Sequence, residues 1–496
     1  MVDSLPLNEQ LLHRHAARVS IPTYDRAALT RGVVHISVGA FHRSHQAVYF
    51  DDLARRGLGD GWAVTGVGLY RPDVKQALDP QDGLYTVVTR GPAGDSARVV
   101  GVLTRYLYAP EDREAVLCTM ADRRTRLVTL TITTNGYMVD LESGAFAAEV
   151  PAVAHDLANR RQRCSALGLL VEALDRRRRC GLPPFTVLSC DNMAGNGVVA
   201  RTAVVSMAAR RDPELAAWVE ERTAFPDSMV DRITPGTTDE DRRMVERTFG
   251  VRDRWPVITE PFTQWVIEDS FGDVRPPLDE VGVQFVSDVT PHALIKTRLL
   301  NASHLALGHL GSLGGYSRLD ETMADPVFAD FVESMMDDEI SPLLPSVGVD
   351  LPHYTARLRE RFANPQIADP LVRLCRNSPT KLAAHLLPSI REARRLGRPC
   401  GLLTLSVAAW CRHLRGVDER GRRIPAGDEC EERLQALVRR GRGGERRLLA
   451  HEPTFGSLAT CPEFAAAVSS DVRELDADGV RKVLRRRTAH RAVGAA

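Results

Sequence analysis

Three polar residues of one predicted helix have the types and spacing needed for proton transfer at a substrate oxygen. The segment TPHALIKTRLLNASHLALGHLGSLGG favours a largely apolar helix over residues 291–313, which contains Lys296, Asn301 and His304. At about 100° per residue, His304 falls about 80° and Asn301 about 140° from Lys296, so the three share one side of the helix. Burial on that surface would lower the pKa of Lys296, which suits a general base near neutral pH.

The lysine content of the chain draws further attention to this position. Of 65 Lys and Arg residues only four are lysine, at positions 75, 296, 381 and 482. Arginine does not release its proton near neutral pH, so a lysine in this arginine-rich chain can mark a place where a removable proton is needed. A structural interpretation stays open, in which Lys296 extends its charge to solvent, Asn301 caps a loop and His304 is a hydrogen-bonded core histidine.

A second polar cluster follows the strand predicted at residues 185–190. The sequence SCDN ends at Asn192, and Gly195-Asn196-Gly197 comes soon after it. Ligands bind at the carboxyl ends of strands in open α/β sheets, so the Asn192 amide could donate a hydrogen bond to a substrate oxygen. The same residues are equally good turn formers, and that alternative also stays open.

The first half of the chain alternates strands and helices in the way typical of a parallel sheet. Apolar, β-branched runs predict strands over residues 33–38, 62–69, 127–133 and 185–190, with helical patterns between them. After about residue 290 the strand pattern ends and helices follow. We therefore expect an α/β part followed by a mostly α-helical part.

The first predicted strand leads into a candidate dinucleotide site. The segment HISVGAFHRSHQAVYFDDL has the order strand, turn, helix, in which backbone N–H groups at a helix start can meet a pyrophosphate. It departs from G-x-G-x-x-G, because Ser37, Gly39 and His42 stand at the three glycine positions, and an ordinary tight turn is the alternative. After the second strand the first acid is Asp73, and Arg71 precedes it, so charge alone does not decide between NAD and NADP.

Composition argues against several classes of protein. The 65 basic and 64 acidic residues leave a formal charge of +1, which predicts no general attraction to nucleic acid or to an anionic membrane. With 44% hydrophobic and 26% charged residues, and no run of about 18 apolar residues, we expect a soluble cytoplasmic protein without a leader segment. The nine cysteines show neither CxxC nor other metal-ligand spacing, so we expect no disulfide framework and no metal site.

With these pieces placed, the chain resembles the polyol-specific long-chain dehydrogenases, the mannitol dehydrogenase family, and is most similar to its mannitol 2-dehydrogenase branch. The likeness runs from about residue 30 to beyond 415. It rests on GAFHRSHQAVYFDDL, LTITTNGY, SCDNMAGNG, SMVDRITPGTTDED, EPFTQWVIED, RFANPQIADPLVRLCRNSPTK and the K-x-x-x-x-N-x-x-H pattern that starts at Lys296.

The resemblance implies a Rossmann-type N-terminal domain at residues 1–288, a mostly α-helical C-terminal domain at 289–496 and an active site in the cleft between them. It implies Lys296 as the catalytic base, Asn192 and Asn301 as the amides that hold the reacting oxygen, and His304 beside them. The cofactor-binding turn would comprise Val38, Gly39, Ala40, Phe41, His42 and Arg43. The substrate site would be lined by Val230, Asp231, Arg373 and Lys381.

The activity implied is metal-independent, reversible oxidation of a polyol to a ketose with NAD, D-mannitol to D-fructose above all, with NADP still open. Partners other than this small-molecule substrate, such as nucleic acid or a membrane, are not expected, and the protein would be a monomer or small oligomer. Fructuronate and tagaturonate reductases and arabinitol dehydrogenases share much of the pattern and are the alternatives within the family. A sensor of sugars or nucleotides on the same fold, without catalysis, is a more remote one.

Overall fold

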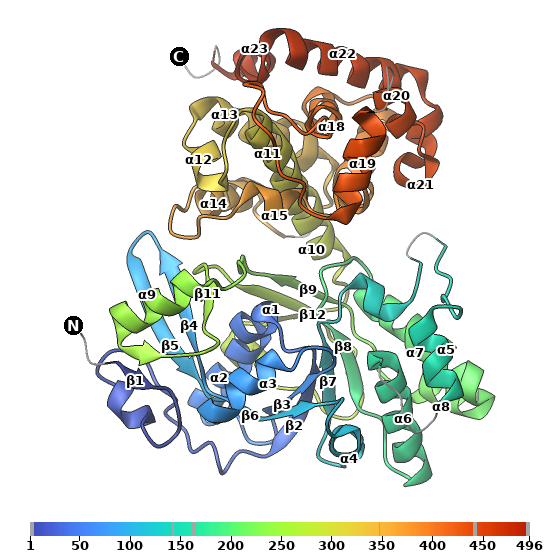
Figure 1. The fold of residues 1–496 in the computed structure, drawn as a ribbon. Coiled ribbons are helices and arrows are strands. Elements are labelled where there is room, and N and C mark those ends of the chain that lie inside the picture. Colours follow the sequence, from blue (N-terminus) through green and yellow to red (C-terminus); the bar gives the residue numbers. More distant parts are fainter. Residues whose placement is uncertain (1–3, 141–142, 160–164, 347, 440–443, 493–496) are drawn as a thin grey trace. The chain divides into compact units, whose positions relative to one another are not determined.

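The computed structural model describes residues 4–140, 143–159, 165–346, 348–439 and 444–492. The chain divides into two compact units, Met1–Thr290 and Pro291–Ala496. Unit 1 is built on sheets, and unit 2 consists of helices (Figure 1). Among the described residues, every helix is too short or too polar to cross a lipid bilayer.

The centre of unit 1 is a five-stranded parallel sheet in the order β6-β3-β2-β7-β8. The strands are β2 (Arg31–Ile36), β3 (Ala63–Gly68), β6 (Leu103–Tyr108), β7 (Leu127–Leu130) and β8 (Thr186–Ser189). Counted along the chain within this sheet, their order is 3-2-1-4-5, which is that of the Rossmann dinucleotide-binding fold. The predicted Rossmann-type N-terminal domain is therefore confirmed.

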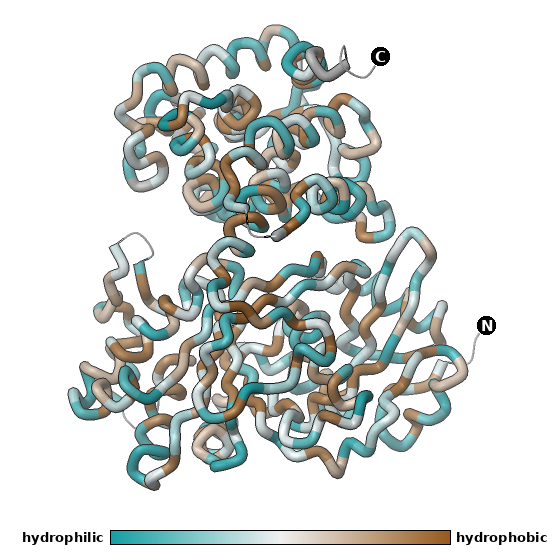
Figure 2. Tube along the Cα trace, turned by 180° about the vertical axis from the view of Figure 1, so that it is seen from behind, coloured by the Kyte–Doolittle hydropathy of each residue, from teal (hydrophilic) through white to brown (hydrophobic). Residues whose placement is uncertain are grey.

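Alternate residues of these strands enter two separate cores, one on each face of the sheet. Val34 and Ile36 of β2 pack in one core, while Val33 packs in the other. Both faces are covered, which explains why the strands read as continuous apolar runs rather than as alternating ones. Figure 2 shows these runs as brown segments within unit 1.

Helices cover both faces of the sheet (Figure 1). The first core contains residues of α4 (Arg113–Ala121), α6 (Ala166–Arg179), α7 (Asn196–Arg211) and α8 (Pro213–Arg222). The second core contains residues of α2 (Gln46–Arg55) and α3 (Asp73–Leu78). Unit 1 also contains α1 (Ala40–Ser44), α5 (Pro151–Ala158) and α9 (Asp239–Phe249).

Smaller sheets complete unit 1. One joins β11 (Val257–Thr259), β4 (Tyr85–Gly91) and β5 (Gly94–Val100), and another joins β13 (Gln284–Val286), β12 (Gln264–Glu268) and β9 (Ser228–Asp231). The short strands β1 (Leu5–Pro6) and β10 (Val251–Arg252) form a pair. None of these strands was among the four predicted, because their short or mixed polar runs lack a clear two-residue period.

Unit 2 has one large apolar core built from helices. At its centre, α11 (Ala302–Leu313) packs against α18 (Gly401–His413) and α15 (Leu371–Cys375), and α18 packs against α22 (Pro462–Asp478). Around them lie α12 (Leu319–Met323), α13 (Pro326–Ser334), α14 (Leu351–Phe362), α16 (Ser378–Lys381), α17 (Leu387–Arg395), α19 (Glu429–Arg439), α20 (Gly444–Leu449), α21 (Glu452–Phe455) and α23 (Val480–Ala492). The predicted helical C-terminal domain is confirmed.

The helix expected over residues 291–313 is not a uniform α-helix. After α10 (Thr290–Ile295) the chain forms a π-helical segment at Lys296–Asn301 and then returns to α-helix as α11. Periodicity in the sequence does not reveal this change, because a π-helical segment widens a single turn without altering the apolar character around it. Similar π-helical segments occur at Met335–Ile340 and Leu382–Leu386.

Candidate active site

The ligand crevice of a Rossmann sheet lies where the strand order reverses, which here is between the carboxyl ends of β2 and β7. Hydrogen bonds join the two loops at this point. The Thr131 hydroxyl donates to the Ser37 carbonyl over 2.8 Å, and the imidazole of His35 contacts the Thr131 and Thr129 hydroxyls at 2.9 and 2.8 Å. Ser37 has a φ of +75°, the left-handed backbone that the glycine of the common fingerprint would favour.

The predicted cofactor turn, Val38 to Arg43, directly follows β2, with Gly39 as the N-cap of α1. Its two basic side chains point into the protein. Burial above all lowers the pKa of His42 well below its usual range, and the ring stacks on His35 with centroids 3.4 Å apart. The Arg43 guanidinium donates to the Trp255 carbonyl and lies over the Tyr85 ring. What this turn can offer an anion is therefore backbone N–H groups, not the cationic side chains noted in the sequence.

Arg71 and Asp73 lie beyond the carboxyl end of β3, where the sequence placed the choice between NAD and NADP. The Arg71 guanidinium donates to the Asp73 carboxylate, and the Arg71 side chain is 74% exposed. Arg71 is thus engaged by an acid of its own loop, which reduces what it can offer to a 2′-phosphate.

Asn192 is exposed just beyond the end of β8, as its position in SCDN predicted. The residue before it ties β8 to the loop after β7: the Asp191 carboxylate accepts N–H bonds from Ile132 and Thr133 at 3.0 and 2.9 Å and an O–H bond from Tyr137 at 2.7 Å. Burial raises the pKa of Asp191 above its ordinary value, although these three bonds oppose the shift. Asp191 therefore positions the loop that carries Asn192, a role that sequence reasoning missed.

Val230 and Asp231 lie in β9, and both side chains are buried. This strand is fixed against the end of β8 by Asn196, whose amide donates to the carbonyls of Asp191 and Ser228 at 3.0 and 2.8 Å and accepts from the Ser228 N–H at 2.9 Å. Asn196 is thus a structural residue. The polar cluster seen in the sequence separates into this brace and the exposed Asn192.

In unit 2, the π-helical segment begins at Lys296 and ends at Asn301. In an α-helix these residues would lie about 140° apart around the axis. The i→i+5 hydrogen bonding of a π-helix puts more residues into each turn, so residues five apart lie closer together around the axis than in an α-helix. The distortion therefore brings Lys296 and Asn301 nearer to one face. Lys296 is buried, with 6% of its surface exposed.

His304 lies within the electrostatic reach of several cations. After burial, which is the largest cause, the positive charges of Arg373, Arg361, Lys381 and Lys296 lower its pKa well below the usual range. His304 is thus a neutral imidazole, and its ring packs 4.4 Å from that of Phe362. Unit 2 therefore brings together all five of the site residues predicted within it: Lys296, Asn301, His304, Arg373 and Lys381.

The two predicted substrate residues are held by different partners. The Arg373 guanidinium donates twice to the buried Asp369 carboxylate. The Lys381 ammonium donates to the Leu374 carbonyl at 2.9 Å. Burial, and secondarily the charge of Arg373, lower the pKa of Lys381 to about 8.

Sequence reasoning missed two members of this group, Arg361 and His385. Burial, then the charges of Lys296 and Lys381, lower the pKa of His385 to about 3, so it is neutral at physiological pH. His385 lies four residues after Lys381, a spacing that puts both on one side of a helix and could have drawn attention to it. Arg361 lies in α14 and gave no comparable signal.

Three buried polar atoms in this group lack a hydrogen-bond partner among the described residues. One is Nδ1 of His385, and the other two, in the helix that contains Lys296, are Nδ2 of Asn301 and Nε2 of His304. Leaving a buried donor or acceptor unpaired costs about 1–3 kcal/mol, so such atoms are normally matched by a partner or a ligand. A hydroxyl or carbonyl oxygen could satisfy the Asn301 and His304 atoms.

These features define a class: a Rossmann-type nucleotide-binding unit joined to a helical unit that carries a buried lysine with amide and imidazole groups. Comparison with known proteins gives the family. The chain matches the mannitol dehydrogenase Rossmann domain over residues 31–280 and the mannitol dehydrogenase C-terminal domain over residues 288–476. It belongs to the mannitol dehydrogenase family, as the sequence motifs predicted.

Relatives resemble the chain over nearly its whole length. Mannitol 2-dehydrogenase from Aspergillus fumigatus is 44% identical, and the match covers 97% of this chain and 98% of that protein. Mannitol 2-dehydrogenase from Pseudomonas fluorescens, solved as a ternary complex with NAD and D-mannitol, has a TM-score of 0.91 and 41% identity over 97% of this chain and 99% of that one. A substrate-free D-sorbitol dehydrogenase has a TM-score of 0.86 and 35% identity over 96% and 99%.

Proposed function

We propose that this protein interconverts D-mannitol and D-fructose, with Lys296 as the general base in oxidation and the general acid in reduction. The coarser prediction, an NAD-dependent polyol dehydrogenase, is confirmed by its family and by relatives that match along the whole chain. The choice of mannitol is supported by relatives that carry that name and by the mannitol bound in the Pseudomonas structure.

Cofactor binding is assigned to the predicted domain 1–288. The residues at the end of β2 fit a dinucleotide, because the helix that starts at Gly39 leaves its first N–H groups without helical partners next to the switch point of the sheet. Backbone groups of Val38 to Arg43 would hold the pyrophosphate. When bound, NAD supplies the acceptor for the hydride.

Proton transfer is assigned to Lys296. In oxidation its uncharged amine takes the proton of the substrate's secondary hydroxyl while the hydrogen on the same carbon leaves as hydride, so the alcohol becomes a ketone. In reduction the protonated amine returns the proton to the oxygen. Asn192 and Asn301 donate hydrogen bonds to the oxygen as negative charge develops on it, an effect worth about 3 kcal/mol per donor.

The remaining polar groups would hold the polyol. His304 can contact the hydroxyl next to the reacting one, and Val230, Asp231, Arg373 and Lys381 would line the rest of the chain of hydroxyls. The observation that carries the proposal is the pair of unpartnered atoms, Asn301 Nδ2 and His304 Nε2, beside the buried Lys296.

Replacing Lys296 tests the proposal directly. Lys296→Ala should lower kcat for fructose reduction by about 10²–10⁴-fold while NADH still binds, because the proton donor is lost. Lys296→Arg should fail as well, since it keeps the charge but cannot release the proton. Lys75→Ala, at a partly buried surface lysine that pairs with Asp79, is the matched control and should retain full activity. Near-normal turnover of Lys296→Ala would exclude the lysine as base.

A second candidate is a hexuronate reductase of the fructuronate or tagaturonate type. It is favoured by one observation, the group of Lys296, Arg361, Arg373 and Lys381 around His304, which would suit a substrate carboxylate. Fructose and fructuronate should be compared with NADH at equal concentration, with arabinitol and sorbitol tested in the other direction. A higher kcat/KM for fructuronate would select the second candidate, and no turnover with any of them would favour a sensor. The cytoplasmic location and the monomeric or small oligomeric state stay predictions.

A further inference from the structure

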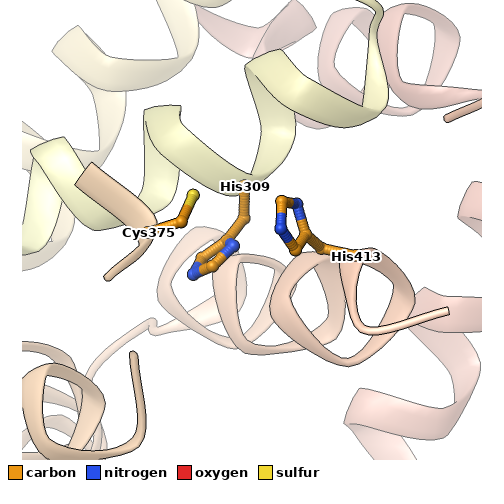
Figure 3. Close-up of side chains that lie close together, drawn as sticks. All are labelled: His309, Cys375 and His413. Atoms are coloured by element: carbon orange, nitrogen blue, oxygen red, sulfur yellow. The ribbon is translucent and has the colours of Figure 1, made fainter. Parts of the chain in front are cut away.

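Three buried side chains of metal-binding types, none of them assigned to catalysis, meet inside unit 2. His309 comes from α11, Cys375 from the end of α15 and His413 from the end of α18 (Figure 3). Each is only 1% exposed. One ligand atom of each residue lies within 4.8 Å of those of the other two. The sequence does not predict this group, because its members are far apart in the chain and form no motif of closely spaced ligands.

Hydrogen bonding fixes which nitrogen of each imidazole is available. The Ser378 hydroxyl donates its hydrogen to the Cys375 carbonyl, so in its 3.2 Å contact with His309 Nε2 it must accept. His413 Nε2 lies 2.7 Å from the Glu431 carboxylate, which also accepts from a nitrogen. Both imidazoles therefore carry their hydrogen on Nε2, and both keep a lone pair on Nδ1.

These two lone pairs have no hydrogen-bond donor. The Nδ1 atoms of His309 and His413 are buried and lack partners among the described residues. The two rings lie edge to face with centroids 4.7 Å apart. Two nitrogen lone pairs that lack a partner among the described residues, brought together with a thiol in an apolar core, point to a cation bound between them.

The surroundings of the cluster fit a bound cation. A metal-bound histidine commonly donates its other N–H to a carboxylate, which is the arrangement of His413 and the 3% exposed Glu431. A divalent ion, a Cys375 thiolate and the Glu431 carboxylate would together be neutral. The positive charge of Lys381, which is held by the Leu374 carbonyl, opposes a cation but favours the thiolate form of Cys375.

The packing of α15 on α11 brings Cys375 close to Gly308, the residue that precedes His309. A Cβ atom on Gly308 would lie 3.1 Å from the Cys375 sulfur and 3.1 Å from the Leu374 Cβ, so only glycine at this position of α11 permits the approach without adjustment. The chain thus keeps room for the thiol immediately next to His309.

We propose that His309, Cys375 and His413 bind one divalent cation of the Zn²⁺ class. Two imidazoles and a thiolate are the ligands such ions prefer, with bonds of about 2.0–2.3 Å and therefore roughly 3.5 Å between ligand atoms. The three ligand atoms, all within 4.8 Å of one another, are near enough for this. The fourth position falls to water or a hydroxyl. The ion takes no part in hydride transfer. It fastens α15 and α16, which carry Arg373 and Lys381, to α11 and α18.

Cobalt is the direct probe, because tetrahedral Co²⁺ bound to a thiolate has a charge-transfer band that Co²⁺ on surface carboxylates lacks. Full-length protein without a histidine tag is treated with a chelator and titrated with Co²⁺, then with Zn²⁺. We expect one Co²⁺ per chain with a thiolate band, displaced by one Zn²⁺, and a higher melting temperature with Zn²⁺ than without.

Variants show whether the band arises at this site. Cys375→Ser should abolish the band and the Zn²⁺-dependent rise in melting temperature. Glu431→Gln should weaken Zn²⁺ binding about 10–100-fold. Cys411→Ala removes a different buried thiol, which lies in α18. It should change neither the thiolate band nor the affinity for Zn²⁺.

The wild-type titration decides the matter even if a variant does not fold. Absence of a thiolate band at stoichiometric Co²⁺, or a band that persists in Cys375→Ser, would overturn the proposal.

Discussion

Lys296 and Asn301 are the first and last residues of one π-helical segment, and this relationship aligns a proton-transfer group with an amide donor. In a regular α-helix the two side chains would lie farther apart around the axis, by about 140°. π-Helical segments inside α-helices occur frequently at functional sites. The alignment is a local property of unit 2, so it can be tested without reference to unit 1.

Removing the amide of Asn301 should slow the chemical step. Asn301→Ala is expected to lower kcat about 10²–10³-fold, because one donor to the developing negative charge is lost, while the KM for NADH stays near that of the wild type. Steady-state rates at saturating fructose and NADH measure this. A kcat within threefold of the wild type would remove Asn301 from the reacting oxygen.

Asn192 and Asn196 should respond in opposite ways to the same substitution. Asn192→Ala should lower kcat with little change in stability, because the side chain is exposed. Asn196→Ala should lower the free energy of unfolding by about 1–3 kcal/mol, because buried carbonyl and N–H groups of Asp191 and Ser228 lose their partners. Urea unfolding and steady-state kinetics on both variants distinguish the two roles, and equal loss of stability would contradict them.

Lys381 should make the unfolding free energy depend on pH above 8. Its pKa is about 8 in the folded protein and 10.5 as an ordinary lysine, so between these values the unfolded state binds more protons. The free energy of unfolding therefore rises with pH through this window, by about 1–3 kcal/mol. Below pH 8 Lys381 is protonated in both states, so it adds no pH dependence there.

The control for this titration is Lys381→Met, which keeps the length of the side chain but has no charge. The difference in unfolding free energy between wild type and variant should shrink as the pH rises from 8 to 10.5, because the cost of burying the charge disappears. Urea unfolding at several pH values measures it. Parallel curves for the two proteins would show that Lys381 keeps an ordinary pKa.

The Arg71–Asp73 pair gives a prediction about cofactor choice. The wild type should use NADH with a higher kcat/KM than NADPH, because Arg71 is engaged by Asp73. Asp73→Asn should raise kcat/KM with NADPH by about tenfold, since it frees a cation for the 2′-phosphate and removes a repelling charge. Replacing Glu111, which pairs with Lys75 in the same region, by Gln should leave the cofactor ratio unchanged. An unaltered ratio in Asp73→Asn would place this pair away from the ribose.

The sequence predicted the two-part fold because its signals are strong where burial is complete. The strands around Val34, Val67 and Leu188 are covered on both faces, which selects continuous apolar runs that are easily read. The small sheets containing β4 and β9 were missed because their short strands mix polar and apolar residues, and pairing with distant segments decides their conformation.

The predicted site residues were found by type and spacing, but the details that govern their chemistry were not. The π-helical segment changes the direction of Asn301 without changing the pattern of the sequence. The inward position of Arg43 depends on Trp255 and Tyr85, which are distant in the chain. His385 enters the group only because its helix packs against the segment that carries Lys296. Such contacts between distant residues arise from tertiary packing, which local patterns do not encode.

Hydrogen bonds from Thr131, just after β7, to His35 and to the Ser37 carbonyl link the carboxyl ends of β2 and β7. They restrict the conformations of the crevice where the strand order reverses. A ligand that enters a rigid crevice restricts few additional backbone and side-chain motions, so less conformational entropy is lost on binding. The affinity for the dinucleotide then depends on the rigidity of the crevice before binding as well as on the contacts between protein and dinucleotide. Thr131→Val removes the hydroxyl that bonds to His35 and Ser37. It should weaken dinucleotide binding although no side chain assigned to the cofactor is changed.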